Sequence, residues 1–176
     1  GCTAIDSIIL NDPPAFSAIP AIDTTIDCSG NATGTLTAAG SGGTPGYSYE
    51  WHTSNIFTLP SAVTQVYDNL LSGTYYVKVT DTLGCADSTS ILLSDPTVLS
   101  VAAVIDTAIR CNGDATGTVT ATGTGGTPGY TYVWSETAGV FNGPSPTIDS
   151  VQTLDNVDAD TYYVQVTDTV GCKATS

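Results

Sequence analysis

The chain has very little positive charge and no long apolar run, and each absence excludes a class of function. Lysine and arginine together number 3, against 17 aspartate and glutamate residues, which gives a net charge of −14. Nucleic-acid binders of the usual kind need a basic surface, and anionic membranes attract basic segments. No segment approaches the roughly 18 consecutive apolar residues of a membrane-spanning helix. We therefore expect neither a nucleic-acid partner nor insertion into a membrane.

Residues suited to catalysis are scarce as well. His52 is the only histidine, and because it follows Trp51 in an alternating segment it is predicted to face solvent. The second copy of the repeat described below has Ser135 at the matching position, so no Ser-His-Asp or Cys-His set occurs twice. We expect no catalytic residue.

One acidic cluster, formed by Asp155, Asp158 and Asp160, has two interpretations. The first copy of the repeat offers only Asp68 nearby, which argues against a glycosidase carboxylate pair. The cluster is therefore predicted to be a solvated loop, and calcium binding is the alternative. We expect no cofactor other than this possible calcium ion.

An internal repeat dominates the sequence. Residues 28–38 recur as 111–121, residues 42–51 as 125–134, and residues 74–85 as 161–172. The offset is 83 residues early in the repeat and 87 late, so the second copy carries an insertion between Trp134 and Tyr162. Such self-similarity predicts two modules of one architecture.

The phase of the repeat predicts the module boundaries. Gly1-Cys2 matches Gly84-Cys85, and Asn11-Asp12-Pro13 matches Ser94-Asp95-Pro96. We expect residues 1–12 to be the last strand of a preceding repeat, residues 13–95 to be module 1, and residues 96–176 to be module 2 without its final strand. On this interpretation the chain is an excerpt of a longer array.

Alternating residues predict strands and their buried face. Tyr47, Tyr49 and Trp51 alternate with polar residues, as do Tyr75, Val77 and Val79. The 30 threonines favour strands as well, and glycine-rich turns separate the apolar segments. About seven short strands per repeat predict an all-β fold of tandem immunoglobulin-like β-sandwich modules in a linear array. Tyr76 and Tyr163 face away from the predicted core and are the candidates for contact with surface polysaccharide.

The five cysteines predict disulfides rather than a metal site, since no CxxC motif occurs. Pairing within modules is favoured and gives Cys28–Cys85 and Cys111–Cys172, with Cys2 bonded to a preceding module. The alternative pairs Cys2 with Cys28 and Cys85 with Cys111. Either scheme implies an oxidising, extracellular location.

The combined motifs resemble the SprB-type repeats of Bacteroidetes cell-surface adhesins and gliding-motility filament proteins. The matching segments are Cys-x-Gly, a Gly-Thr strand, Gly-Gly-Thr-x-x-Tyr-x-Tyr-x-Trp, and Gly-Thr-Tyr-x-Val-x-Val-Thr-Asp-x-x-Gly-Cys. The first copy matches all four, and the second departs at Asp160, where the first has Gly73. The resemblance implies secreted surface filaments used in adhesion or gliding, without catalytic residues.

The same resemblance implies covalent glycans, because secreted proteins of this group carry O-glycans on Asp-(Ser/Thr)-(Ala/Ile/Leu/Val/Met/Thr) triplets. The alternative is that these Asp-Thr pairs only form turns, in which aspartate is common. The triplets place the predicted acceptors at Ser7, Thr24, Thr82, Ser88, Thr107, Ser150 and Thr169.

The sequence therefore predicts a non-enzymatic structural or adhesive segment of a long extracellular surface filament. Its partners would be neighbouring repeats of the same or identical chains, covalent glycans and surface polysaccharide. The alternative is a glycan-binding immunoglobulin-like module appended to a larger secreted protein.

Overall fold

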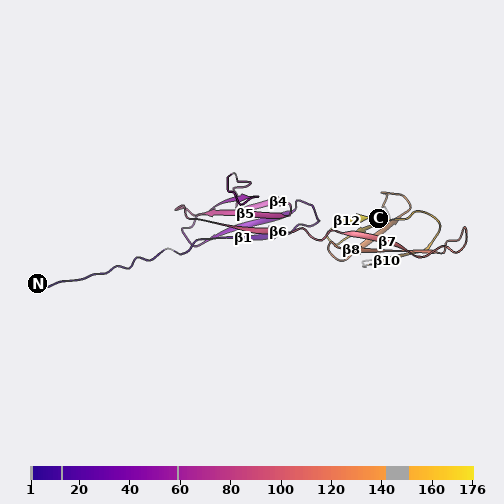
Figure 1. Cartoon of the computed structure of the whole chain (residues 1–176), viewed down its shortest axis with the longest axis horizontal. Coiled ribbons are helices and arrows are strands. Elements are labelled where there is room, and N and C mark those ends of the chain that lie inside the picture. The colour runs from indigo at the N-terminus through magenta and orange to yellow at the C-terminus, as the bar shows by residue number, and fades with distance from the viewer. Residues whose placement is uncertain (1, 13, 59, 142–150) are drawn as a thin grey trace. The chain divides into compact units, whose positions relative to one another are not determined.

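The computed structural model describes residues 2–12, 14–58, 60–141 and 151–176. It divides into two compact units (Figure 1). Unit 1 contains the residues up to Thr25 together with Thr33–Leu93, and unit 2 contains Ile26–Ala32 and Ser94–Ser176. The units meet in sequence at Leu93 and Ser94, two residues before the predicted boundary.

Unit 1 consists of two three-stranded antiparallel sheets. One sheet has the order β1-β2-β4 and the other has the order β3-β5-β6. The strands are β1 (Ser17–Thr24), β2 (Gly34–Ser41), β3 (Ser48–His52), β4 (Val66–Leu70), β5 (Gly73–Thr80) and β6 (Ala86–Leu93).

Unit 2 repeats this topology, with sheets ordered β7-β8-β10 and β9-β11-β12. Its strands are β7 (Ser100–Thr107), β8 (Gly117–Thr124), β9 (Thr131–Ser135), β10 (Val151–Val157), β11 (Tyr163–Thr167) and β12 (Lys173–Thr175).

The predicted fold class is confirmed. The order of strands corresponds to strands A, B and E of an immunoglobulin domain in one sheet and strands C, F and G in the other. The described residues form six strands per unit rather than about seven. In unit 1, residues 53–58 and 60–65 occupy the place of strand D and contribute a single bridge between Trp51 and Ala62.

The core follows the predicted alternation. Trp51, Val77 and Val79 are fully buried, and Leu36 from the opposite sheet is buried with them. Antibody domains place an inter-sheet disulfide on strands B and F. Here those strands carry Leu36 and Val77, so the core contains no cysteine and the cysteines lie in loops.

The predicted strand at residues 1–12 does not form in the described residues 2–12. The equivalent segment, β6, is held by its pairing with β5. Ile5, Ile8 and Leu10 are consequently almost fully exposed. The final strand of module 2, expected to be missing, is present in short form as β12.

The strand directions give each unit two distinct ends. In unit 1, Ser17 of β1 pairs with Ser41 of β2, and the turn between β5 and β6 lies at this same end. We call it the leading end, because the first strand begins there. At the other end, the trailing end, the β1–β2 loop lies with the end of β6. Unit 2 has the same two ends, by the same pairings.

A tyrosine fixes the turn between β4 and β5. The Tyr75 hydroxyl donates a hydrogen bond of 2.8 Å to the carbonyl of Leu71, and its ring stands edge-on to Tyr67 at 5.8 Å. This is the tyrosine corner of immunoglobulin-like folds. Burial raises the pKa of Tyr75, with a further contribution from Tyr67.

Replacement of Tyr75 by phenylalanine should destabilise unit 1 by about 1 kcal/mol, because the carbonyl of Leu71 loses its donor. Urea unfolding followed by tryptophan fluorescence would measure the change, in a Trp134→Phe background so that Trp51 reports on unit 1 alone. The half-buried neighbour provides the control, since Tyr76→Phe should have little effect. Equal losses for the two variants would contradict this role of Tyr75.

Candidate functional site: the cysteine-bearing loops

The turn between β5 and β6 is organised by a buried carboxylate. Asp81 is 5% exposed and accepts hydrogen bonds from the backbone N–H groups of Leu83 (2.9 Å) and Cys85 (2.8 Å). Its other oxygen accepts from the N–H of Thr44 at 2.9 Å, in the turn between β2 and β3. One side chain therefore joins two turns and sets the position of Cys85, which is exposed.

Unit 2 repeats this arrangement around Asp168, which is also 5% exposed. Its carboxylate accepts from Val170 at 3.1 Å, Cys172 at 2.9 Å and Thr127 at 2.9 Å. Gly171 has a φ of +93°, a conformation that favours glycine and explains why the motif reads Asp-Thr-x-Gly-Cys. Sequence reasoning had assigned these aspartates only to turns and glycosylation triplets, and their burial was missed.

Hydrogen bonding lowers the pKa of Asp81 below its ordinary value of 3.8, with the N–H of Thr44 as the largest cause. A lowered folded-state pKa contributes stability that is present at neutral pH and is lost as the pH falls through the folded value.

We therefore expect unit 1 to lose stability below about pH 4, and Asp81→Asn to remove that part of the pH dependence. At neutral pH the variant should melt roughly 5 °C lower, because an amide cannot accept all of these N–H groups. Thermal melts followed by circular dichroism between pH 3 and pH 7 would measure both effects. The exposed Asp68→Asn variant is the control, and an unchanged pH profile in Asp81→Asn would contradict the assignment.

The second cysteine-bearing loop precedes the second strand of each repeat. In residues 26–32 the N–H of Asn31 donates to the carbonyl of Cys28 at 3.0 Å, and Gly30 has a φ of +83°. In the matching loop the N–H of Asp114 donates to Cys111 at 3.1 Å, and Gly113 has a φ of +90°. The sequence similarity thus corresponds to the same local fold.

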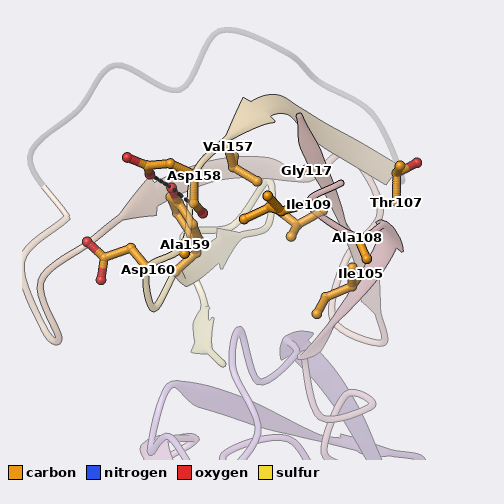
Figure 2. Close-up of a pocket in the computed structure, with 11 residues that line it drawn as sticks. Ile105, Thr107, Ala108, Ile109, Gly117, Val157, Asp158, Ala159 and Asp160 are labelled. Atoms are coloured by element: carbon orange, nitrogen blue, oxygen red, sulfur yellow. Dashed lines mark hydrogen bonds between the residues drawn. The ribbon is translucent and has the colours of Figure 1, made fainter. Parts of the chain in front are cut away.

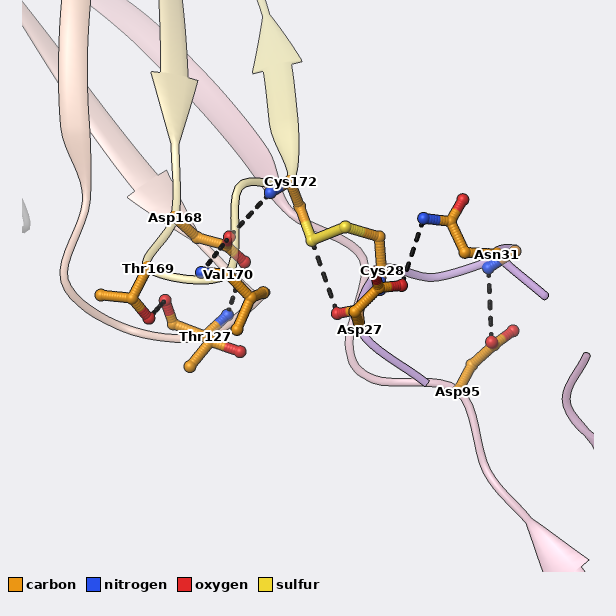
Figure 3. Close-up of a disulfide and its surroundings, with 10 residues drawn as sticks. Asp27, Cys28, Asn31, Asp95, Thr127, Asp168, Thr169, Val170 and Cys172 are labelled. Atoms are coloured by element: carbon orange, nitrogen blue, oxygen red, sulfur yellow. Dashed lines mark hydrogen bonds between the residues drawn. A yellow bond between two sulfur atoms is a disulfide. The ribbon is translucent and has the colours of Figure 1, made fainter. Parts of the chain in front are cut away.

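The structure joins these two kinds of loop through a disulfide between Cys28 and Cys172 (Figure 3). Both residues belong to unit 2, where Gly30 beside the bond also donates an N–H to Asp95 at 3.3 Å. The bond spans 144 residues of sequence. In the chain-entropy model, closing a loop of this size stabilises the folded state by about 5 kcal/mol. Cys2, Cys85 and Cys111 are free thiols within the described part of the chain.

The predicted pairs Cys28–Cys85 and Cys111–Cys172 are therefore wrong, and the alternative pairing is not formed either. Strand direction is the physical reason. Cys28 lies at the trailing end of its repeat and Cys85 at the leading end, separated by strands of eight residues, or roughly 26 Å. A disulfide needs Cα atoms within about 7 Å of each other, so pairing within a repeat is excluded.

The predicted glycosylation positions lie on the surface where the structure describes them. The exposed positions are Ser7, Thr24, Thr82, Ser88, Thr107 and Thr169, and Ser150 lies outside the described residues. The Thr82 hydroxyl lies 3.4 Å from the carbonyls of Thr44 and Pro45, and Thr169 makes the equivalent contacts. The structure does not bring these positions together into one site.

His52 differs from its prediction because it is 2% exposed instead of solvated. The segment after β3 folds back, and the Phe57 ring packs edge-on against the imidazole at 4.6 Å. Neither ring nitrogen has a hydrogen-bond partner among the described residues.

The acidic cluster borders the pocket shown in Figure 2. The cavity has a volume of about 190 Å³, with Ile105 and Ile109 on one side and Asp158 and Asp160 on the other. The Tyr162 hydroxyl donates to the Asp158 carboxylate at 2.7 Å, and this bond is the main reason that the pKa of Tyr162 rises to about 12. Across the described ranges, no three His, Cys, Asp or Glu side chains are placed to hold a metal ion. The cavity is smaller than the roughly 300 Å³ of typical ligand pockets.

A second hollow lies on the outer face of the β3-β5-β6 sheet of unit 1. It has a volume of about 370 Å³ and contains Tyr76, one of the two tyrosines predicted to be available for contact. Its other lining residues are Asn55, Phe57, Ser88, Thr89 and Ser90. The structure also has no helix, among the residues it describes, that is long and apolar enough to cross a membrane.

Comparison with solved structures finds immunoglobulin-domain proteins. The chain is similar to the mouse nectin-like molecule 4 ectodomain (Ig1–Ig3), at 13% identity over 90% of this chain and 62% of that one, with a TM-score of 0.38. It is similar to the four N-terminal Ig domains of Dscam1 isoform 6.44, at 19% identity over 94% and 46%, with a TM-score of 0.31. The chain thus spans less than two thirds of either protein chain. Comparison with curated protein sequences gives no significant match.

The repeated segments match a family model. The family model called SprB repeat matches residues 24–55 and 107–139, which contain the early cysteines, Cys28 and Cys111, and the two strands that follow each of them. Two segments of the chain therefore match the SprB repeat, and the resemblance seen in the sequence is confirmed.

Proposed function

We propose that this chain is a non-enzymatic, structural or adhesive segment of a long filament on the outside of a cell. The observation that carries the proposal is the Cys28–Cys172 disulfide, which joins one repeat covalently to the next. A bond of this kind persists in oxidising compartments, which supports an extracellular location. The match to the SprB repeat supports the same location, because the resemblance implies surface filaments used in adhesion or gliding.

The topology of the sandwich supports a mechanical role. In unit 1 the first strand starts at the leading end and the last strand finishes at the trailing end. Such a module can be extended into a linear array without a long connection. The junction segment Ser94-Asp95-Pro96 contains no Gly/Ser run, and Pro96 restricts both its own φ and the residue before it. The net charge of −14 would also keep neighbouring filaments apart at low ionic strength.

Small-angle X-ray scattering of the chain should give a rod-like profile, and the maximum dimension should not change with protein concentration. Cys28→Ser should broaden the distance distribution, because the disulfide link between the repeats is lost and only the peptide chain joins them. Cys85→Ser is the matched control and should leave the profile unchanged. A compact globule, or freely jointed beads in the unmodified chain, would refute a stiff filament segment.

The same sample would discriminate the alternative of a glycan-binding module. Such a module should bind polysaccharide as a monomer and lose binding on Tyr76→Ala, since Tyr76 lines the hollow on the outer face of the β3-β5-β6 sheet. The filament proposal expects no binding by the single chain in solution.

We further propose that Thr82 and Thr169 carry covalent glycans in the native protein. Both are exposed, and both occupy the same turn position in their repeats. Intact-mass analysis of protein isolated from its native source should show hexose increments, and peptide mapping should place them on these two residues. A native mass equal to that of the bare sequence would rule the modification out.

A further inference from the structure

The cysteines that remain free occupy the same positions as the two that are bonded. Cys111 in the second repeat corresponds to Cys28 in the first, and Cys85 in the first corresponds to Cys172 in the second. We use "early cysteine" for Cys28 and Cys111, and "late cysteine" for Cys85 and Cys172. The single disulfide of the described residues joins the early cysteine of one repeat to the late cysteine of the next.

The free late cysteine is held in the conformation of the bonded one. The Asp81 carboxylate accepts from the N–H of Cys85 at 2.8 Å, and the Asp168 carboxylate accepts from that of Cys172 at 2.9 Å. In each turn the glycine N–H donates to the aspartate carbonyl at 3.1 Å. The φ values of the two glycines are +87° and +93°.

The free early cysteine, Cys111, lies in a loop with the same geometry as the loop of the bonded Cys28. The backbone hydrogen bonds that close the loops of Cys28 and Cys111 measure 3.0 Å and 3.1 Å, and the glycines within them have φ values of +83° and +90°. Both free thiols, Cys85 and Cys111, are exposed. Two exposed cysteines thus have the geometry of a bonded pair without the partner that the pair requires.

The ends of the sandwich determine where those partners must come from. An early cysteine lies at the trailing end of its repeat, and a late cysteine lies at the leading end. The two cysteines of each repeat therefore lie at its opposite ends. The two cysteines of one repeat, such as Cys28 and Cys85, are too far apart to satisfy each other.

We propose that Cys111 forms a disulfide with the late cysteine of a following repeat, and that Cys85 forms one with the early cysteine of a preceding repeat. The partner is another repeat of this kind, in the same chain or in a second copy of it. Every repeat in an array is then bonded covalently to both neighbours in a fixed register, early cysteine to next late cysteine. The inference rests on the end-to-end order of repeats in the proposed function, but not on adhesion.

The chemistry is an oxidation of two thiols. Each new bond forms between two sulfur atoms, and two protons and two electrons leave the cysteine pair. A disulfide-containing oxidant, either a thiol-disulfide oxidoreductase or a small-molecule disulfide such as oxidised glutathione, accepts them and is reduced to two thiols by exchange.

A chain that contains its own following repeats tests the proposal. Residues 1–176 are followed directly by residues 7–176, so that β12 continues into Ile8–Leu10, the segment that corresponds to Ile91–Leu93. Cys85→Ser in the first half and Cys111→Ser in the second make the remaining Cys85 and Cys111 unique. The protein is oxidised with a glutathione redox buffer, its thiols are blocked at low pH, and it is digested with pepsin without reduction.

Mass spectrometry should find Cys111 of the first half bonded to Cys85 of the second, with Cys28–Cys172 in both halves and one blocked thiol at Cys2. The dilute single chain is the control and should retain Cys85 and Cys111 as thiols. A fused chain in which Cys28–Cys172 forms but Cys111 stays free, giving three blocked thiols, would overturn the proposal. So would a bond from Cys111 to the Cys172 of its own repeat, a Cys85–Cys111 bond in the single chain, or the absence of Cys28–Cys172 from both halves.

Scattering from the same fused chain separates this inference from the proposed function. A flexible profile with the Cys111–Cys85 bond present would refute the stiff filament and leave the disulfide register intact. A rod-like profile with both thiols free would refute the disulfide register and leave the stiff filament intact.

Discussion

The carboxylates of Asp81 and Asp168 each hold together two turns that are far apart in sequence. Without such an acceptor, the N–H groups of the Gly-Gly-Thr-Pro-Gly turn and of the Asp-Thr-x-Gly-Cys turn would meet at one end of the sandwich with too few partners. Burial of those groups without hydrogen bonds would be costly. The aspartate satisfies them and fixes the backbone of the late cysteine in each turn.

The apolar core is the part of the molecule that the sequence predicts best. Alternation along Tyr75, Val77 and Val79 identifies a buried face because successive side chains of a strand point to opposite sides. The same rule failed at His52, since the segment that follows β3 folds back and Phe57 covers a face expected to meet solvent. Local patterning could not show this, because the covering residue comes from an irregular segment that has no periodicity.

The spacing of the cysteines along the sequence could not predict their pairing, for a different reason. Two cysteines flank the strands of each repeat, and their separation along the sequence is compatible with a bond between them. Whether they meet depends on how many strands run between them and in which direction. Only the antiparallel order of β2, β4 and β5 places Cys28 and Cys85 at opposite ends. A small domain was expected to need an internal disulfide, but Leu36 and Val77 fill that place in the core.

The Cys28–Cys172 bond also changes what a broken backbone would mean. The bond bypasses 144 residues of sequence, including the exposed segment after β3. Cleavage by a protease at any one peptide bond inside that span leaves both fragments attached through sulfur. The damaged molecule would keep its covalent continuity from one terminus to the other, and it would separate only after a reductant had also cut the disulfide. In the extracellular location proposed above, where hydrolytic enzymes are present, the molecule would therefore keep its mechanical continuity after one cut in the peptide chain.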